Sequence, residues 1–316
     1  MQYLIIGGGV ASVAAIEGIR RQDKGGAITL VTAEPVKTYG RPLISYYLAG
    51  KIGKDKIAYR PEKFWKDNKV ELVLGTTVTS LDTKAKKAAL SDGSVLSYDA
   101  CLLATGGKPF APAVEGSDGP DVYRFTTLAD AEALMARLDE QGRPVRRAAI
   151  VGAGLIALKA AEGLAARGVE VTLVVRSRIM RAYFDEPAGE LLVRHLEKKG
   201  VKFLNGQTPQ AILRGKDGRV KAVRTDKGQQ EADLVILAAG VRPNLDLAKS
   251  AGIECGKGVL VNDRLMTSAK DVYAAGDVAE AVDLITGERR VIPIWPNAYN
   301  QGFYAGRNMA GADVDY

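Results

Sequence analysis

The chain has 316 residues, of which 47% are hydrophobic and 26% are charged. This length exceeds that of one ordinary α/β domain and predicts two domains with sizeable cores. The formal net charge of +7 would attract polyanionic cofactors or an acidic protein partner, or would only aid solubility. No basic run is interleaved with aromatic residues, so we expect no nucleic-acid partner.

The sequence carries no sign of export or of a membrane anchor. The first predicted strand begins at Gln2, which leaves no room for a signal peptide. No apolar run is long enough to cross a bilayer. We therefore expect a cytoplasmic protein with no membrane partner.

The two cysteines and the single histidine predict no metal site. Cys101 and Cys255 stand far apart and form no Cys-x-x-Cys pair, which argues against a disulfide framework or a structural zinc site. Cys101 lies in an apolar run at 100–104, where we expect a buried and inert thiol. His195 lies in a charged helical stretch and is expected at the surface.

The first predicted elements form a βαβ unit. An apolar strand at 3–6 leads through a glycine turn into an Ala-rich helix that ends near Arg21, and a second strand follows at 27–31. Further β-like runs then follow, at residues 70–74, 77–81, 88–90 and 100–104.

The same order of elements returns after a Pro-, Gly- and Ala-rich stretch at 109–120, which is typical of a linker. Two strands with a helix between them are predicted first, and then further β-like runs, over residues 148–151, 169–175, 201–204, 211–213, 220–224 and 234–239. An internal duplication is the simplest account. Another strand is predicted at 271–275, after a second crossing near 242–244.

This pattern predicts an α/β fold with two Rossmann-like dinucleotide-binding domains, each with a parallel sheet and a β-meander insert. We expect the first domain to cover 1–110 and the second 111–241. The segment 242–316 is expected to return to the first domain.

Two glycine turns follow strands and open helices, and they carry the prediction of dinucleotide binding. They are Gly7-x-Gly9-x-x-Ser12 and Gly152-x-Gly154-x-x-Ala157. The first glycine permits a tight turn, the second lets the backbone approach a pyrophosphate, and the small third residue lets helix and strand pack closely. The helix N-terminus then offers N–H groups to the phosphates. One such motif is weak evidence, whereas two in the required context are specific.

The end of the second strand in each unit indicates which nucleotide is bound. Glu34 stands there in the first unit, and an acid at this place suits a ribose diol. The second unit has Arg176 and Arg178 instead, with Arg181 soon after. Arginine suits a 2′-phosphate, which favours NADPH over NADH. The alternative is that these arginines are only solvent-exposed.

Five motifs in combination resemble those of the FAD-dependent pyridine nucleotide reductases, the glutathione-reductase structural family. They are the first glycine turn with Glu34, residues 104–109, the second glycine turn, residues 239–244 and residues 273–277. The resemblance covers essentially the whole chain. It implies that 1–110 and 242–316 bind FAD, that 111–241 bind NAD(P)H, and that Asp277 contacts the ribityl and phosphate part of FAD.

Within this family the chain is most similar to the NADH:rubredoxin oxidoreductase and nitrite-reductase flavoprotein branch, through residues 39–50 and 295–302. This implies that Arg41 and Pro42 lie along the flavin and that the segment beginning at Trp295 caps it. Further cofactor contacts are implied at Val78, Thr105, Gly106, Ile156 and Gly240.

Three departures from the family pattern stand out. Pro42 occupies the place of a redox cysteine, so relay through a cysteine is not expected. Many relatives have a Lys–Glu pair beside the flavin. In this chain Lys159 occupies the position of the glutamate, and Ser45 occupies that of the lysine. Our hypothesis is that Lys159 stabilises an anionic reduced flavin, the alternative being a solvated helix lysine. The C-terminal interface domain of relatives would begin where this chain ends.

The resemblance implies an FAD-dependent NAD(P)H oxidoreductase. A nicotinamide would deliver hydride to FAD, and electrons would pass to an external acceptor, such as a rubredoxin or another small acidic redox protein. One alternative is an NAD(P)H oxidase that uses oxygen. Another is a non-catalytic or regulatory flavoprotein module of a larger redox complex.

Overall fold

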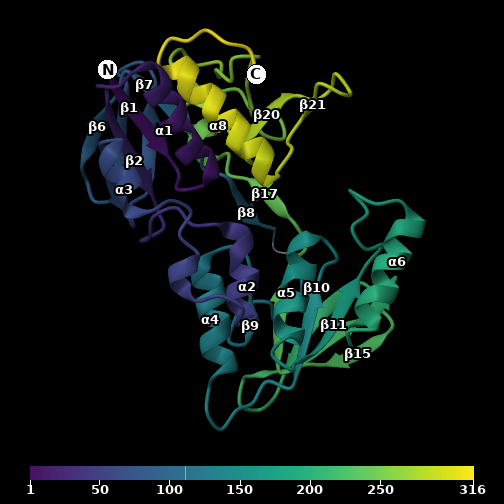
Figure 1. The fold of residues 1–316 in the computed structure, drawn as a ribbon. Helices are drawn as coiled ribbons and strands as arrows, with labels where there is room; N and C mark the ends of the chain where they lie inside the picture. The colour runs from purple at the N-terminus through teal and green to yellow at the C-terminus, as the bar shows by residue number, and fades with distance from the viewer. Residues whose placement is uncertain (111) are drawn as a thin grey trace. The chain divides into compact units, whose positions relative to one another are not determined.

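The computed structural model describes residues 1–110 and 112–316, which divide into two compact units (Figure 1). Unit 1 comprises Met1–Tyr39, Ala58–Lys108 and Arg242–Tyr316, and unit 2 comprises Gly40–Ile57 and Pro109–Val241. Strands β8 (Gly107–Pro109) and β17 (Val241–Pro243) lie where the chain passes from one unit to the other. Ala111, at which the second domain was predicted to start, lies outside the described residues.

Unit 1 is built on a five-stranded parallel sheet with the order β19-β7-β1-β2-β3. These strands are Val272–Ala274, Ala100–Leu103, Gln2–Ile6, Ala27–Thr32 and Val70–Leu74. Ile6 pairs with Val31 on one side and with Leu103 on the other, so the carboxyl ends of three strands align. The strand order reverses beside β1, and ligands of such sheets bind at that switch point.

The central strands are apolar because helices cover the sheet. All four residues of β7 are buried, as expected for a strand with both faces covered. Helix α1 (Val10–Gln22) connects β1 to β2.

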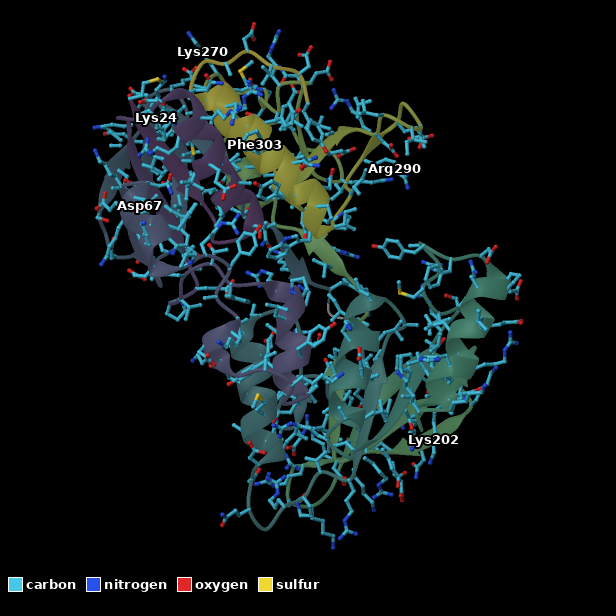
Figure 2. All side chains as sticks on the ribbon, viewed as in Figure 1. Lys24, Asp67, Lys202, Lys270, Arg290 and Phe303 are labelled. Atoms are coloured by element: carbon cyan, nitrogen blue, oxygen red, sulfur yellow. The ribbon has the colours of Figure 1, made fainter. Side chains whose placement is uncertain are left out.

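Helix α8 (Trp295–Met309) crosses α1 at very short range (Figures 1 and 2). A Cβ added to Gly302 would lie 2.1 Å from the carbonyl oxygen of Ala11, and one added to Gly306 would lie 2.2 Å from that of Ala15. A Cβ added to Gly18 on α1 would likewise lie 2.2 Å from the carbonyl oxygen of Phe303. Glycine is therefore required at three positions of this crossing.

The remaining elements of unit 1 are short. They are the antiparallel meander of β4 (Val78–Asp82), β5 (Lys87–Leu90) and β6 (Val95–Ser97), the sheet of β18 (Val259–Leu260), β20 (Ala279–Val282) and β21 (Arg289–Arg290), and helices α3 (Glu62–Asp67) and α7 (Asp246–Ser250).

Unit 2 repeats this plan, as the duplication in the sequence predicts. Its parallel sheet has the order β12-β11-β10-β16-β9, formed by Lys202–Asn205, Glu170–Val175, Arg147–Val151, Leu234–Leu237 and Val122–Tyr123. The helices are α4 (Leu128–Leu138), α5 (Leu155–Ala165) and α6 (Glu186–Glu197), and the meander is β13 (Pro209–Arg214), β14 (Val220–Thr225) and β15 (Gly228–Glu231). The α/β fold with parallel sheets and meander inserts is thus confirmed.

The division differs from the predicted boundaries in one segment. Gly40–Ile57 was expected inside 1–110, yet it belongs to unit 2. The segment contains the short helices η1 (Arg41–Leu43), α2 (Ile44–Leu48) and η2 (Lys54–Lys56), and α2 packs against α4 and α5. Leu48 is fully buried, its carbonyl oxygen accepts a 2.7 Å hydrogen bond from Nε of Arg167, and its side chain lies against Gly163. Burial of this apolar side chain fixes the segment there.

Candidate dinucleotide sites

The first glycine turn has the geometry of a phosphate cradle. Gly7 has φ = +123°, and a Cβ there would lie 2.1 Å from the carbonyl oxygen of Ala104 at the end of β7. Gly9 begins α1, and no described atom lies within 4 Å of the place a Cβ would take. Ser12 is fully buried and its hydroxyl donates to the Gly7 carbonyl oxygen at 2.7 Å. The space over Gly9 and the helix N-terminus suit an anionic group.

The second glycine turn repeats these relationships in unit 2. Gly152 has φ = +134°, and its Cβ would lie 2.2 Å from the carbonyl oxygen of Ala238. Gly154 begins α5, and again no described atom lies within 4 Å of the position that a Cβ would occupy. Ala157 is fully buried, as the small third residue should be. Ile156 lies in the first turn of the helix.

Glu34 follows β2 and is held in place at both its backbone and its side chain. Its backbone carbonyl accepts a hydrogen bond from Gly75 N at 3.1 Å. Its Oε2 accepts one from the Tyr39 hydroxyl at 2.7 Å. Sequence reasoning included Tyr39 only as the start of the 39–50 stretch and gave it no role beside Glu34, although the two residues are close in sequence.

The loop that carries Asp277 lies beside the N-terminus of α1. Gly276 has φ = +82°, and a Cβ there would lie 3.3 Å from the Cβ of Ala11. Its N–H donates to Oε1 of Gln301 at 2.8 Å, and Gln301 is buried on α8. The predicted Asp277 and the glycine turn are therefore neighbours in space, although they are far apart in sequence.

Other predicted FAD contacts lie in ordered surroundings within unit 1. Thr105 and Asn244 form two hydrogen bonds. The Asn244 side-chain amide donates to the Thr105 carbonyl oxygen at 2.8 Å, and the Thr105 hydroxyl donates to the Asn244 carbonyl oxygen at 3.2 Å. Gly106 follows with φ = +63°. Trp295 packs edge-on against Tyr59 with ring centroids 5.1 Å apart. Val78 is buried in β4.

Lys159 lies in a cluster of charged and aromatic side chains inside unit 2. Its Nζ lies 2.7 Å from Oε2 of Glu162 and 5.1 Å from the centroid of the Tyr46 ring. Lys51 approaches the same two groups, at 3.4 Å and 5.7 Å. Hydrogen bonding to Lys159 holds the pKa of the Glu162 carboxyl below its usual range. The lysine is therefore partnered rather than merely solvated.

Ser45 and Arg41 lie in the same segment of unit 2. The buried Ser45 hydroxyl donates to the Pro42 carbonyl oxygen at 3.0 Å. Nη1 of Arg41 donates to the Thr126 carbonyl oxygen at 2.9 Å.

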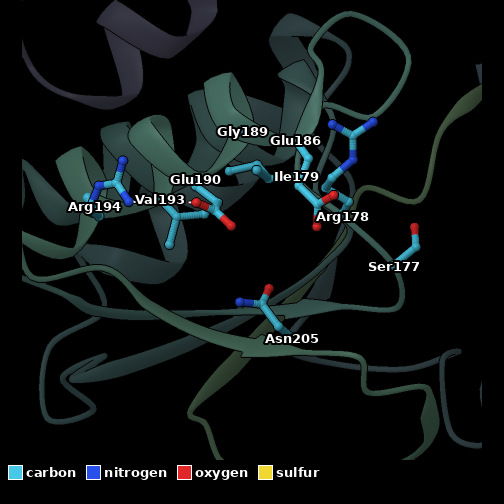
Figure 3. Close-up of a pocket in the computed structure, with 9 residues that line it drawn as sticks. All are labelled: Ser177, Arg178, Ile179, Glu186, Gly189, Glu190, Val193, Arg194 and Asn205. Atoms are coloured by element: carbon cyan, nitrogen blue, oxygen red, sulfur yellow. Dashed lines mark ion pairs between the residues drawn. The ribbon is translucent and has the colours of Figure 1, made fainter.

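A pocket of about 320 Å³ opens at the carboxyl ends of β11 and β12, beside α6 (Figure 3). Ser177 and Arg178 line it from the loop after β11, and Asn205 lines it from the end of β12. Nη1 of Arg178 donates to the Phe184 carbonyl oxygen at 2.7 Å. Arg176 and Arg181 in the same loop are exposed, and so is Gly240 at the end of β16.

Sequence reasoning also missed Arg124, which follows β9. Its Nη1 is buried, and no described atom forms a hydrogen bond with it. A buried guanidinium nitrogen of this kind calls for an acceptor that the described residues do not supply. No pattern in the sequence marked this arginine, because the signal is its burial.

Cys101 and His195 lie where the sequence predicted them. Cys101 is completely buried in β7, and burial raises the pKa of its thiol. Burial also raises the pKa of the Cys255 thiol, which donates to the Ile253 carbonyl oxygen at 3.3 Å. His195 is exposed on α6. Within 1–110 and 112–316 there is no group of three or more metal-ligating side chains, and none of the described helices is long and apolar enough to cross a membrane.

Comparisons with known proteins extend over the whole chain. The family model described as pyridine nucleotide-disulphide oxidoreductase matches residues 1–302. An NADH oxidase of Methanocaldococcus jannaschii is 35% identical over 100% of this chain and 71% of its own length. A rubredoxin-NAD(+) reductase of Pseudomonas putida is 32% identical over 99% of this chain and 81% of its own length.

Solved structures are also similar to this chain over its whole length. A NAD-dependent persulfide reductase from A. fulgidus has a TM-score of 0.93 and 30% identity over 100% of this chain, which spans 60% of that protein. A water-forming NADH oxidase from Lactobacillus brevis, bound to NADH, has a TM-score of 0.91 and 26% identity over 100% of this chain and 71% of that one. An engineered NADPH oxidase derived from it, bound to NADPH, has a TM-score of 0.91 and 28% identity with the same coverage. With its two glycine turns and this match, the chain belongs to the pyridine nucleotide-disulphide oxidoreductase family, whose members use FAD and NAD(P)H.

Proposed function

We propose that this oxidoreductase takes hydride from NADPH onto FAD and passes the electrons to a small acidic redox protein in the cytoplasm. The observation that carries the proposal is the duplicated glycine turn, with open space over Gly9 and over Gly154 at two helix N-termini. Two such cradles accommodate two dinucleotides.

Unit 1 provides the proposed FAD site. Gly7 and Gly9 would hold the pyrophosphate against α1, and the buried Ser12 would brace the turn through its bond to the Gly7 carbonyl oxygen. Glu34 would accept hydrogen bonds from the hydroxyls of the adenosine ribose. Asp277 would contact the ribityl part from the loop beside α1. When bound, FAD supplies the chemistry, because it accepts a hydride and can release the electrons singly or as a pair.

The preference for NADPH is supported by the engineered oxidase. Its five substitutions include glycine to alanine and, further along, aspartate to alanine followed directly by changes to arginine and to serine. The interval between the first two changes equals that between Ala157 and Val175 here, and Arg176 and Ser177 follow Val175. This chain therefore carries the introduced residue itself at three of these positions, Ala157, Arg176 and Ser177. At the fourth it has Val175, which like the introduced alanine lacks the charge of the aspartate.

The fifth substitution introduces a further arginine. At the matching interval this chain has Ala182, with Arg181 beside it. Arg176 and Arg181 are both exposed and able to meet a 2′-phosphate.

The proposed role of Lys159 is to favour the reduced flavin through its positive charge. Glu162 and the Tyr46 ring restrict where its ammonium group can lie. Glu162 offsets one positive charge, and Lys51 on the same carboxylate leaves the group of Lys51, Lys159 and Glu162 with a net positive charge.

An external acceptor is supported by the state of the two thiols. The pKa of each is raised by burial, so neither forms a thiolate readily at neutral pH. The net charge of +7 favours an acidic partner, and one relative is named a rubredoxin-NAD(+) reductase.

An anaerobic experiment tests the proposal. The flavin absorbance of the purified holoprotein is followed after mixing with NADPH and, separately, with NADH. We expect fast bleaching with NADPH and slower bleaching with NADH. Bleaching by neither nucleotide, with FAD bound, would instead favour a regulatory module.

The acceptor is tested by adding oxidised rubredoxin at increasing salt concentration. We expect the rate of carrier reduction to fall steeply with salt. A rate independent of salt would contradict recruitment by charge.

An oxidase is the second candidate, because relatives at 35% and 26% identity are named NADH oxidases. Oxygen consumption without any carrier distinguishes the two. Turnover in air as fast as turnover with rubredoxin would replace our proposal with the oxidase.

A further inference from the structure

Tyr39 and Glu34 form a short hydrogen bond inside unit 1. The Tyr39 hydroxyl donates to Oε2 of Glu34 at 2.7 Å. Tyr39 is only 6% exposed, whereas Glu34 is half-buried. A carboxylate that accepts a hydrogen bond from a buried phenol is restricted in its rotation.

The backbone on both sides of this bond is also fixed. Tyr39 forms a β-bridge with Ala58, and the carbonyl oxygen of Thr38 accepts a hydrogen bond from Tyr59 N at 3.1 Å. Glu34 N is bonded to Oγ1 of Thr32 at 3.3 Å. The tyrosine hydroxyl and the carboxylate therefore face each other from two anchored segments.

We propose that Tyr39 is a positioning residue for FAD, which holds the Glu34 carboxylate where it receives the hydroxyls of the adenosine ribose. This inference rests on the proposed FAD site. A ribose diol needs acceptor oxygens in a defined place, and an acceptor that is already oriented loses less conformational entropy on binding. The phenol contributes that orientation without contacting the cofactor.

The test is the affinity of the apoprotein for FAD after Tyr39→Phe, measured by quenching of flavin fluorescence. We expect FAD to bind about tenfold more weakly, because the Glu34 carboxylate is no longer oriented before FAD binds. Affinity for FMN, which has no adenosine, should not change. The melting temperature of the apoprotein should fall no further than in Tyr3→Phe, which loses the same kind of bond.

Tyr3→Phe is the matched control. Tyr3 is equally buried, and its hydroxyl donates to the carboxylate of Asp23 at 2.9 Å. Asp23 lies at the C-terminal end of α1, whereas the glycine turn lies at its start. We expect this variant to bind FAD as the parent does.

A double-mutant cycle separates the inference from the proposed site. In a Glu34→Ala background, Tyr39→Phe should weaken FAD binding no further. Equal loss of FAD and FMN affinity in Tyr39→Phe, or an unchanged FAD affinity beside a weakened Glu34→Ala, would overturn the positioning role alone. Unchanged FAD affinity in Glu34→Ala would overturn the proposed ribose contact itself.

Discussion

Gly7 and Gly152 have the same environment in two separate folding units. Each has a positive φ, of +123° and +134°, and each lies against the backbone carbonyl that follows the neighbouring strand. Ala104 supplies that carbonyl in unit 1 and Ala238 supplies it in unit 2. The duplication read from the sequence thus extends to a specific steric contact.

In the second turn, Gly152 should matter for folding stability and Gly154 for nucleotide binding. Gly152→Ala should destabilise the protein by about 2 kcal/mol or more, because a Cβ there meets a backbone oxygen and the positive φ is strained. Gly154→Ala should leave stability nearly unchanged and weaken NADPH binding about tenfold or more, because its Cβ would occupy the space of the pyrophosphate. Urea unfolding and nucleotide titration measure the two effects. Equal destabilisation by both substitutions would contradict the cradle at Gly154.

Arg176→Gln should reduce kcat/KM for NADPH by about tenfold to a hundredfold, since a charge-assisted contact with phosphate is removed. The value for NADH should change by less than about threefold, because NADH has no 2′-phosphate. Steady-state kinetics with both nucleotides check this. Arg224→Gln is the control, because Arg224 is an exposed arginine on β14 of the same unit. A parallel loss with NADPH and NADH would count against a phosphate contact.

Lys159→Met should make the potential of the bound flavin more negative and slow its reduction by NADPH roughly tenfold, because a cation near the flavin stabilises its anionic reduced form. Lys159→Arg should restore most of the effect. Lys51→Met is the matched control, because Lys51 approaches the same carboxylate and ring at longer range. This variant should change the flavin potential and the reduction rate less than Lys159→Met does. An unchanged potential in Lys159→Met would refute the role of this lysine.

Gly306→Ala should destabilise unit 1 by about 2 kcal/mol or more, because the added Cβ would lie 2.2 Å from the Ala15 carbonyl oxygen and force α8 away from α1. Asn300→Ala on the exposed face of the same helix should be neutral or slightly stabilising, since alanine has the better helix propensity. Thermal unfolding of both variants provides the comparison. A melting temperature of Gly306→Ala equal to that of the parent would show that the crossing can relax.

The Asp23 carboxyl should make the free energy of unfolding fall in acid. Hydrogen bonds from the N–H groups of Gly25 and Gly26, and from the Tyr3 hydroxyl, lower the pKa of its carboxyl from 3.8 to about 2. A carboxyl with a lowered folded-state pKa stabilises the fold above its unfolded pKa, and that stability is lost as the pH falls through the folded value. The free energy of unfolding should therefore decline between about pH 4 and pH 2 more steeply in the parent than in Asp23→Asn. Urea titrations at several pH values measure this, and identical slopes would contradict it.

Much of the architecture was determined by local sequence patterns. Apolar strands, glycine turns and alanine-rich helices predicted both βαβ units, because each turn places its strand and helix through contacts close in sequence. The burial of Cys101 and the exposure of His195 also followed from the residues around them.

Only the tertiary structure decided where Gly40–Ile57 belongs and what surrounds Lys159. Leu48 is buried against α5, and Lys51, Lys159 and Glu162 meet around one tyrosine ring. The contacts of Leu48 with Gly163 and of Lys51 with Glu162 join residues more than a hundred positions apart, and no periodicity in the sequence encodes such pairs. Tyr39 and Glu34 are close in sequence, but Tyr39 also forms a β-bridge with Ala58, and the spacing of these residues encodes neither contact. Long-range packing, which neither composition nor spacing records, selected these partners.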